Sequence, residues 1–249
     1  MPHSRINGFQ MYHDERGDGD ALAYIHGGFP SLAIHLRASA GAKWGWELDF
    51  ARSYRFILHH RRGCWLSERT DSGYDIETQA ADLAKLLDHL GTERAHIVGT
   101  SAGGPIAIAF AAMYPQRTKS LVLGGTGAHL FPATDPFTPI LRQQADTLRR
   151  GGHHALWDAR PEGVETSFAV LWEREEMRQR GTLKDFDMRQ RMLHEAAASV
   201  LAEERALWYA TEVRAMEEYV RTDVTAMCGA IVTPRLVVHG AKDREVPVE

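Results

Sequence analysis

Short apolar runs alternate with helical segments, and this alternation constrains the fold more than any other feature of the chain. Each run ends at or just before glycine or histidine, as short buried strands do. Strands separated by helices pair in parallel and need cover on both faces. The sequence therefore predicts an α/β fold with a mainly parallel sheet and helices on both faces. The predicted strands are Ala21–Ile25, Arg55–Leu58, Ala95–Gly99, Ser120–Leu123 and Arg235–Gly240, and the predicted helices are Ile76–Leu90 and Ala102–Met113.

Local signals define some of the boundaries. Asp75 is suited to cap the helix that follows it, and Gly91 to end that helix. Ile6–Tyr12 alternates weakly, which indicates an edge strand, and the Gly- and Asp-rich stretch Asp14–Asp20 indicates a turn.

The strand pattern stops near Ala128 and resumes at Arg235. The stretch between is rich in Glu, Arg, Ala, Leu and Met, and it predicts the helices Thr138–Arg150, Val164–Arg180 and Asp185–Arg221. A chain of 249 residues fits one domain with a large insertion. We expect residues 1–127 and 224–249 to form the core, and residues 128–223 to form a helical cap over the ends of the strands.

Composition excludes several classes of protein. With 29 Lys and Arg against 33 Asp and Glu, the formal net charge is −4, which argues against binding to nucleic acid. No apolar run reaches the ~18–20 residues of a membrane span, and the polar beginning lacks the apolar region of a signal peptide. Two cysteines cannot form a disulfide framework, which indicates a reducing compartment. We expect a cytoplasmic protein with no membrane partner.

The segment Gly99–Gly103 (GTSAG) matches the pattern G-x-S-x-G between a predicted strand and a predicted helix. In this pattern the serine stands on a strained turn with its hydroxyl above the sheet, so the flanking positions need almost no side chain. The unpaired N–H groups at the start of the helix face any negative charge formed at Ser101. A chance match in an ordinary turn is the alternative, and the flanking strand and helix argue against it.

Two other segments lie at the ends of predicted strands. In His26–Pro30 (HGGFP) the N–H that follows His26-Gly27 can point into the site, and with the N–H of Ala102 it would form an oxyanion hole. A plain turn is the alternative, and we expect His26 to bond the loop backbone. Asp243 follows the last predicted strand, where an acid can orient a catalytic histidine, although aspartate is common in loops.

Taken together, these three segments resemble the α/β-hydrolase fold family, of the serine hydrolase type with a helical cap. The resemblance implies that Ser101 is the nucleophile and Asp243 the triad acid. It also implies that Gly28 and Ala102 supply the oxyanion N–H groups, with Phe29 as an alternative to Gly28. Many relatives carry Asp-x-Arg-Gly after the fourth strand, where this chain has His60 in place of the acid. We expect an altered loop there.

The family's catalytic histidine follows the triad acid, and this sequence has none after Asp243. Its loss from such a triad costs on the order of 10⁶ in turnover. We therefore expect the chain to be a shortened piece, poorly active as given, with the Val237–Val238 strand as an apolar edge of the sheet. We expect none of the other histidines that we considered to serve as the base. These are His59, His60, His96, His153, His154 and His239.

No metal or cofactor site is expected, because His153 and His154 lack a third ligand at useful spacing and no known motif supplies one. The stretch Gly124–Gly127 lacks the ending of a phosphate loop and predicts a turn. Trp172 and Trp208 of the insertion pack its helices or line a substrate pocket.

The function predicted from these features is cofactor-free serine hydrolysis of a small, fairly apolar ester or related acyl compound. A serine nucleophile disfavours dehalogenase and epoxide hydrolase chemistry, where relatives use aspartate. Hydrolysis of carbon–carbon bonds, lactonase and aminopeptidase activities stay open. The competing interpretation is a non-catalytic protein of the same fold, a ligand receptor or degenerate enzyme, with an interaction module as a weaker one. The sequence indicates neither the substrate nor the oligomeric state.

Overall fold

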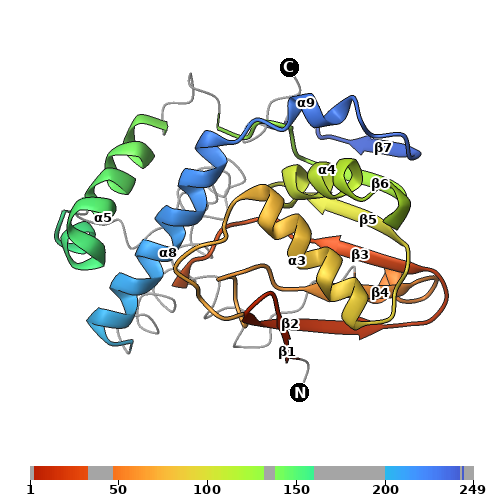
Figure 1. Ribbon diagram of the computed structural model, residues 1–249, viewed down its shortest axis with the longest axis horizontal. Helices are drawn as coiled ribbons and strands as arrows, with labels where there is room; N and C mark the ends of the chain where they lie inside the picture. The colour runs from red at the N-terminus through yellow and green to blue at the C-terminus, as the bar shows by residue number, and fades with distance from the viewer. Residues whose placement is uncertain (1–2, 33–46, 132–137, 160–199, 242, 244–249) are drawn as a thin grey trace, which may run out of the picture.

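The computed structural model describes residues 3–32, 47–131, 138–159, 200–241 and 243 (Figure 1). Its strands form one seven-stranded sheet in the order β1-β2-β4-β3-β5-β6-β7. The strands are β1 (His3–Ile6), β2 (Phe9–Arg16), β3 (Ala21–Ile25), β4 (Arg55–His59), β5 (Ala95–Thr100), β6 (Thr118–Gly124) and β7 (Arg235–Val238). The helices are α2 (Glu47–Phe50), α3 (Ile76–His89), α4 (Gly103–Met113), the 3₁₀ turn η1 (Pro115–Arg117), α5 (Thr138–Asp158), α8 (Ala202–Arg221) and α9 (Thr225–Cys228).

The five strands predicted from apolar runs all pair in parallel, which confirms the mainly parallel sheet. The beginning of the chain differs from the prediction of one edge strand and a turn at Asp14–Asp20. It forms an antiparallel hairpin, β1–β2, and β2 continues to Arg16 beside β4. Asn7 and Gly8 form its turn with φ of 42° and 88°, the positive values for which Asn-Gly is favoured. The hairpin turn at Asn7 and Gly8 was not predicted, and the predicted turn is confirmed only for its second half, where Gly17 and Gly19 have positive φ between β2 and β3.

Helices cover the sheet from both sides. On one face α3 and α4 bury Ile25, Ile57 and Ile97 in the larger core cluster. On the other face the ring of Phe50, from α2, stacks on Phe56 with centroids 5.8 Å apart. The predicted cap of α3 is confirmed, because the Asp75 side chain accepts a hydrogen bond from the N–H of Thr78 at 2.8 Å.

Helices α5 and α8 pack against each other and lie to one side of the sheet in Figure 1. α5 runs further than predicted, to Asp158, and a break at Gly152 with φ 70° divides it. The predicted helix Val164–Arg180 and the first part of Asp185–Arg221 lie outside the described residues. The assignment of residues 128–223 to a cap stays a prediction. None of the described helices is both long and apolar enough to cross a membrane.

Among the described strands, β7 ends the sheet on the side opposite to β1. Its side chains Leu236, Val237 and Val238 are 56%, 60% and 55% exposed. The apolar strand predicted for this edge of the sheet is therefore confirmed.

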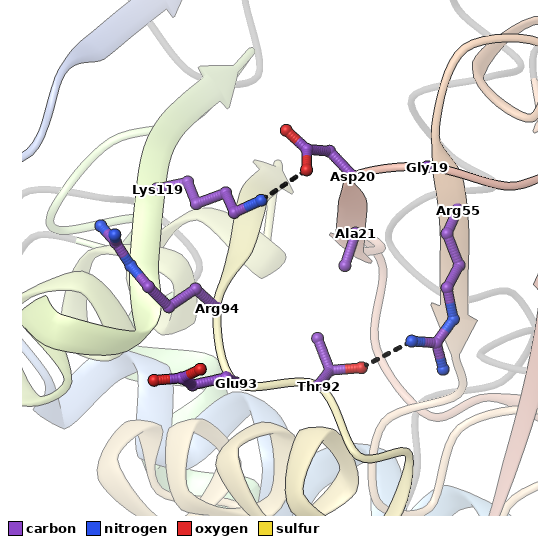
Figure 2. A pocket seen from close by; sticks show the side chains of 8 residues that line it. All are labelled: Gly19, Asp20, Ala21, Arg55, Thr92, Glu93, Arg94 and Lys119. Carbon is purple, nitrogen blue, oxygen red and sulfur yellow. Dashed lines mark hydrogen bonds and ion pairs between the residues drawn. The ribbon is translucent and has the colours of Figure 1, made fainter.

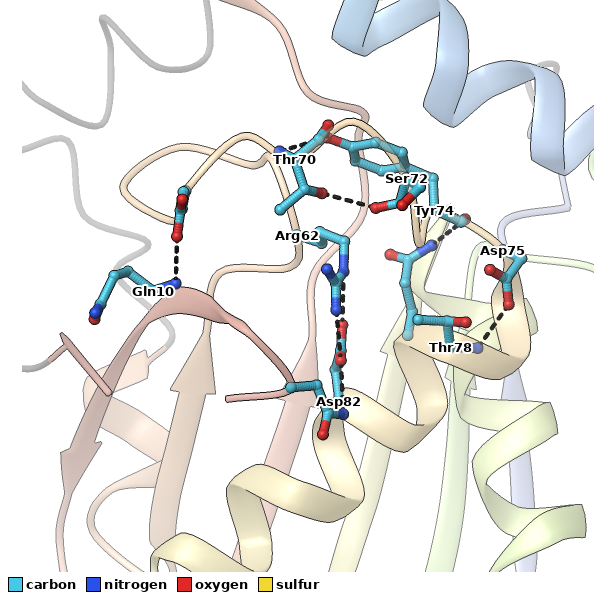
Figure 3. Close-up of polar contacts among 11 residues, drawn as sticks. Gln10, Arg62, Thr70, Ser72, Tyr74, Asp75, Thr78 and Asp82 are labelled. Atoms are coloured by element: carbon cyan, nitrogen blue, oxygen red, sulfur yellow. Dashed lines mark hydrogen bonds and ion pairs between the residues drawn. The ribbon is translucent and has the colours of Figure 1, made fainter. Parts of the chain in front are cut away.

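A buried ion pair fixes the loop after β4 (Figure 3). Arg62 donates from Nε and Nη2 to the two oxygens of Asp82, on α3, at 3.1 and 2.9 Å. Asn7, in the hairpin turn, donates to the same carboxylate at 2.9 Å, and the guanidinium lies 4.1 Å from the ring centroid of Phe9. The pair therefore joins three separate segments of the chain.

We predict that Asp82→Ala lowers the free energy of unfolding by about 3–5 kcal/mol, because it leaves the buried Arg62 charge without its partner. Urea denaturation measures this loss. The matched control is Asp88→Ala on the same helix, since Asp88 is half-exposed and pairs with Arg117 at 2.9 Å. A surface pair of that kind contributes less than about 1 kcal/mol. Equal losses in the two variants would contradict the structural role given to Asp82.

Two neighbouring histidines at the end of β4 are buried as neutral side chains. Burial lowers the pKa of both His59 and His60 to about 3, with smaller contributions from Arg61 and neighbouring histidines. The ring of His60 stacks on Tyr12 with centroids 4.4 Å apart, and its Nδ1 accepts a hydrogen bond from the N–H of Leu66 at 3.2 Å. A histidine in place of the family's acid therefore belongs to the loop's packing.

We predict a loss of stability in acid. The pKa of each histidine is lower in the folded chain than in the unfolded chain, so below pH 6.5 the unfolded chain binds protons that the folded chain does not. The free energy of unfolding therefore decreases as the pH falls from about 6.5 towards 3. Between pH 7.5 and 5.0 each of the two histidines accounts for about 2 kcal/mol of lost unfolding free energy. In His60→Asn, which keeps an acceptor for Leu66, urea denaturation should show a loss smaller by that amount. A pH dependence parallel to wild type would argue against a buried neutral His60.

Candidate active site

The order of the sheet reverses between β3 and β5, because the chain passes from β3 to β4 on one side and returns as β5 on the other. Ligands of open α/β sheets bind at the carboxyl ends of the strands at such a reversal. The predicted oxyanion loop follows β3 and the predicted nucleophile follows β5. The two segments touch, because a Cβ placed on Gly27 would lie 2.8 Å from the Cβ of Ser101.

Ser101 stands on a strained turn. Its φ is 46°, a region that non-glycine residues rarely adopt. The turn packs so closely on β3 that a Cβ on Gly103 would lie 2.2 Å from the carbonyl oxygen of Ile25. Within the described part of the chain the Ser101 Oγ has no hydrogen-bond partner. The base that the predicted chemistry needs is therefore not in contact with Ser101 among these residues.

Backbone bonds connect this turn to the neighbouring strands. The N–H of Ser101 donates to the carbonyl of Gly124 at 3.2 Å, and its carbonyl accepts from the N–H of Gly104 at 2.9 Å. The side chain of Thr126 also donates to the Ser101 carbonyl, at 2.7 Å. The predicted turn Gly124–Gly127 thus supports the serine from the side of β6.

The loop after β3 is held by His26, as the sequence predicts. The ring of His26 is buried against Trp65 with centroids 4.2 Å apart. Its Nδ1 donates to the carbonyl of Gly27 at 2.7 Å, and its Nε2 accepts from the N–H of Arg61 at 3.1 Å. Burial and the charge of Arg61 lower the pKa of His26 well below its usual value, so the ring is neutral and has one donor and one acceptor.

The two alternatives for the first oxyanion donor follow His26 in the same loop. Gly28 has φ 75°, which suits a sharp bend. The ring of Phe29 packs edge-on against Tyr219 of α8, with centroids 4.9 Å apart, and near Phe131 at 5.8 Å. The side chain of Phe29 is thus fixed by apolar contacts. The choice between the N–H groups of Gly28 and Phe29 stays open.

Asp243 lies at the same edge of the sheet as Ser101. Its Oδ2 would be 3.6 Å from a Cβ on Gly125, at the carboxyl end of β6, which is the strand next to β5. The Nε2 of His239 is 3.4 Å from the same oxygen. The fold therefore places a histidine against the predicted triad acid, although His239 is not predicted to be catalytic. The roles of Ser101 and Asp243 stay predictions.

Of the two predicted substrate-binding tryptophans, only Trp208 lies among the described residues. Trp208 is 4% exposed and packs under Arg69, whose guanidinium lies 4.6 Å from the ring centroid. Arg69 also forms an ion pair with Glu204 on the same helix as Trp208. Packing between α8 and the loop after β4 accounts for these contacts, and a contact with substrate stays a prediction. Trp172 lies outside the described residues.

The fold brings a third possible metal ligand to His153 and His154, which sequence spacing alone does not predict. Glu203, at the start of α8, lies 2.6 Å from the Nε2 of His153 and 3.4 Å from that of His154. The ligand atoms of the three residues lie within 4.8 Å of one another. These distances fit a hydrogen bond and an ion pair, so the cluster is explained without a metal.

A cavity of about 300 Å³ lies at the amino ends of the parallel strands, the edge opposite to Ser101 (Figure 2). Three of its charged side chains, Asp20, Arg55 and Lys119, have partners. Lys119 pairs with Asp20 at 2.7 Å, and Arg55 donates to Thr92 at 3.1 Å and pairs with Glu15. None of the predicted catalytic residues lines this cavity.

The comparison with curated proteins gives relatives of several activities. The chain is 28% identical to the 2-hydroxymuconate semialdehyde hydrolase of Pseudomonas sp. (strain CF600), over 89% of this chain and 73% of the relative. It is 34% identical to the cis-3-alkyl-4-alkyloxetan-2-one decarboxylase of Shewanella oneidensis, over 57% of this chain and 43% of the relative. In the latter case the match spans less than half of the relative's length.

Solved structures and a family model identify the fold that these relatives share. The enol-lactonase from Burkholderia xenovorans LB400 has a TM-score of 0.63 at 21% identity, over 98% of this chain and 86% of that one. A thermophilic esterase from Thermogutta terrifontis has a TM-score of 0.61 at 24% identity, over 99% and 83%. At these identities the likeness concerns the fold. The model of the alpha/beta hydrolase fold matches residues 21–249. The chain therefore belongs to the alpha/beta hydrolase fold family.

Proposed function

We propose that this chain carries the active site of a serine hydrolase that acts on a small, fairly apolar ester or related acyl compound. The observation that carries the proposal is the contact between Ser101, on its strained turn, and Gly27 of the loop after β3. This contact brings a hydroxyl and two sets of backbone N–H groups together at the point where the order of the sheet reverses. Such a site accepts a carbonyl carbon and the negative charge that forms on its oxygen.

In the proposed reaction, the Oγ of Ser101 attacks the carbonyl carbon and a histidine oriented by Asp243 takes its proton. The N–H of Ala102, with that of Gly28 or Phe29, binds the oxyanion of the tetrahedral intermediate. The leaving group receives the proton, and water then releases the acyl group from the serine by the same steps. All bond changes occur at the serine, the histidine and water, so we propose no metal or cofactor.

Hydrolysis of a carbon–carbon bond is the second candidate. It is favoured by the alignment with 2-hydroxymuconate semialdehyde hydrolase, which covers 89% of this chain. The same nucleophile and oxyanion donors would serve both reactions, so the two candidates differ in the leaving group. A non-catalytic receptor of the same fold is the third. We also propose a cytoplasmic location, which is consistent with two free cysteines, Cys64 and Cys228.

We predict that, in a form of the protein that includes the triad histidine, a fluorophosphonate probe labels the protein and Ser101→Ala abolishes both labelling and hydrolysis of p-nitrophenyl butyrate. The expected loss of turnover is at least about 10³-fold, because the variant retains only the oxyanion hole and substrate binding. Ser120→Ala on β6 is the matched control, since Ser120 bonds His96 at 2.8 Å, away from the site. Labelling that persists in Ser101→Ala would contradict the assignment. Absence of labelling together with ligand binding would indicate the receptor.

A further inference from the structure

The direction of a backbone N–H is set by whatever holds the carbonyl of the same peptide unit. A trans peptide is planar, and its C=O and N–H point in opposite directions. In the proposed oxyanion hole, the N–H of Phe29 shares a unit with the carbonyl of Gly28, and the N–H of Ala102 with that of Ser101. The groups that bind these two carbonyls therefore aim the two donors.

Arg61 binds the loop after β3 twice. Its guanidinium Nη2 donates to the carbonyl of Gly28, which fixes the unit that carries the N–H of Phe29. Its own backbone N–H donates to His26 at 3.1 Å, and His26 in turn donates to the carbonyl of Gly27 at 2.7 Å. This second path fixes the unit that carries the N–H of Gly28. Both alternatives for the first donor thus depend on Arg61.

The donor at Ala102 is held from both sides. Thr126 donates to the carbonyl of Ser101 at 2.7 Å, in the same peptide unit as the N–H of Ala102. Tyr219 of α8 donates to the carbonyl of Ala102 at 2.6 Å, and its hydroxyl oxygen accepts from Nη1 of Arg61 at 3.0 Å. The Ala102 carbonyl belongs to the following peptide unit, so Tyr219 anchors Ala102 on its other side, whereas Thr126 fixes the unit that carries the donor. Burial raises the pKa of Tyr219 to about 12, so this hydroxyl keeps its proton at neutral pH. One guanidinium therefore connects both halves of the oxyanion hole.

The charge of Arg61 is buried without a carboxylate partner in the described part of the chain. Its side-chain acceptors are neutral, namely the Gly28 carbonyl, the Tyr219 hydroxyl and the Gln79 amide oxygen at 3.1 Å. Arg61 is 3% exposed and an arginine in a protein stays protonated, so this arrangement is costly for stability. The neighbouring histidines His26 and His59 are neutral, so they do not add to this charge, and neither of them can balance it. A lone positive charge one peptide unit from the site stabilises an oxyanion more than a neutral carbonyl.

We propose that Arg61 is a positioning residue for the oxyanion hole. It aims the N–H groups of the loop after β3 and places an uncompensated positive charge behind them. Thr126 aims the N–H of Ala102, and Tyr219 links Arg61 to Ala102 by anchoring the peptide unit that follows this donor. This inference rests on the proposed function, because it assigns the surroundings of the same Ser101 site. Its contribution is to the transition state, where the oxygen is negative, and not to the binding of a neutral substrate.

Four variants and one control test the proposal. Thr126→Val and Tyr219→Phe each remove one hydroxyl without changing the volume much. Arg61→Met removes the guanidinium, and Arg61→Lys restores the charge without the fork that binds two acceptors. Tyr74→Phe is the matched control, because Tyr74 is a buried tyrosine whose hydroxyl donates to Thr70 at 2.7 Å, outside this network. Thermal unfolding identifies any variant that does not fold.

The measurements use the form of the protein that includes the triad histidine. They are kcat and KM for p-nitrophenyl butyrate and the affinity for an aryl trifluoromethyl ketone, which forms an oxyanion with serine. We expect kcat to fall about 10-fold in Thr126→Val and Tyr219→Phe, and about 10²–10³-fold in Arg61→Met, with KM within about 2-fold of wild type. The affinity for the ketone should fall in parallel with kcat, and Arg61→Lys should recover part of the loss. Folded variants with wild-type kcat, or with losses in KM alone, would overturn the proposal.

Failure of the proposed function gives a different result. If wild type shows no turnover that Ser101→Ala removes, the hydrolase assignment fails, and amide NMR of the same variants still tests the geometry. The ¹⁵N and ¹H shifts of Ala102 should then change in both Thr126→Val and Tyr219→Phe, those of Gly28 and Phe29 in Tyr219→Phe, and all three should stay unchanged in Tyr74→Phe. Unchanged shifts in all three would overturn the network as well. If Arg61→Met does not fold, the two hydroxyl variants carry both tests.

Discussion

The arrangement of the site depends on the close contact between the ends of β3 and β5. A side chain at Gly27 would collide with Ser101, and one at Gly103 would collide with the carbonyl of Ile25. Because both positions are glycine, the backbone that follows β3 lies directly against the turn that carries the serine. The positive φ of Ser101 is strained, and the bonds of its backbone to Gly124 and Thr126 hold it in place. In the proposed reaction the hydroxyl acts on the carbon of a carbonyl group, and the N–H groups and the charge of Arg61 act on its oxygen, so the proposal depends on this contact.

Two consecutive arginines in the loop after β4 have different roles. Arg62 is paired with Asp82, so its charge is balanced and its effect is on stability. Arg61 donates only to neutral groups among its described partners, so its charge is available to the site. The sequence motif points to Arg62, the position that fits the family pattern. The structure indicates that the residue before it has more influence on the proposed chemistry.

The sheet could be predicted from the sequence because each parallel strand is a short apolar run that ends at glycine or histidine, and because Asp75 and Gly91 limit α3 by local chemistry. The hairpin at Asn7 was missed, although Asn-Gly is a strong turn signal, since its strands alternate only weakly in polarity. Contacts between distant segments could not be predicted. Arg61 and Tyr219 are separated by 158 positions, and Glu203 reaches His153 across 50. No local pattern encodes these pairs, because the packing of α8 creates them.

The relatives include hydrolases, a decarboxylase and an acetyltransferase, so membership of the family establishes the scaffold and leaves the reaction open. The names of the relatives indicate reactions in which different bonds are broken or formed. An oxyanion hole stabilises the negative charge on one oxygen, whichever bond is broken. The role proposed for Arg61 and Thr126, which is to aim these donors, is therefore compatible with any of these reactions. The side chains that select the leaving group must lie on the substrate side of Ser101. Evidence about the oxyanion donors consequently tests whether the chain is an enzyme, and the substrate has to be identified from the products.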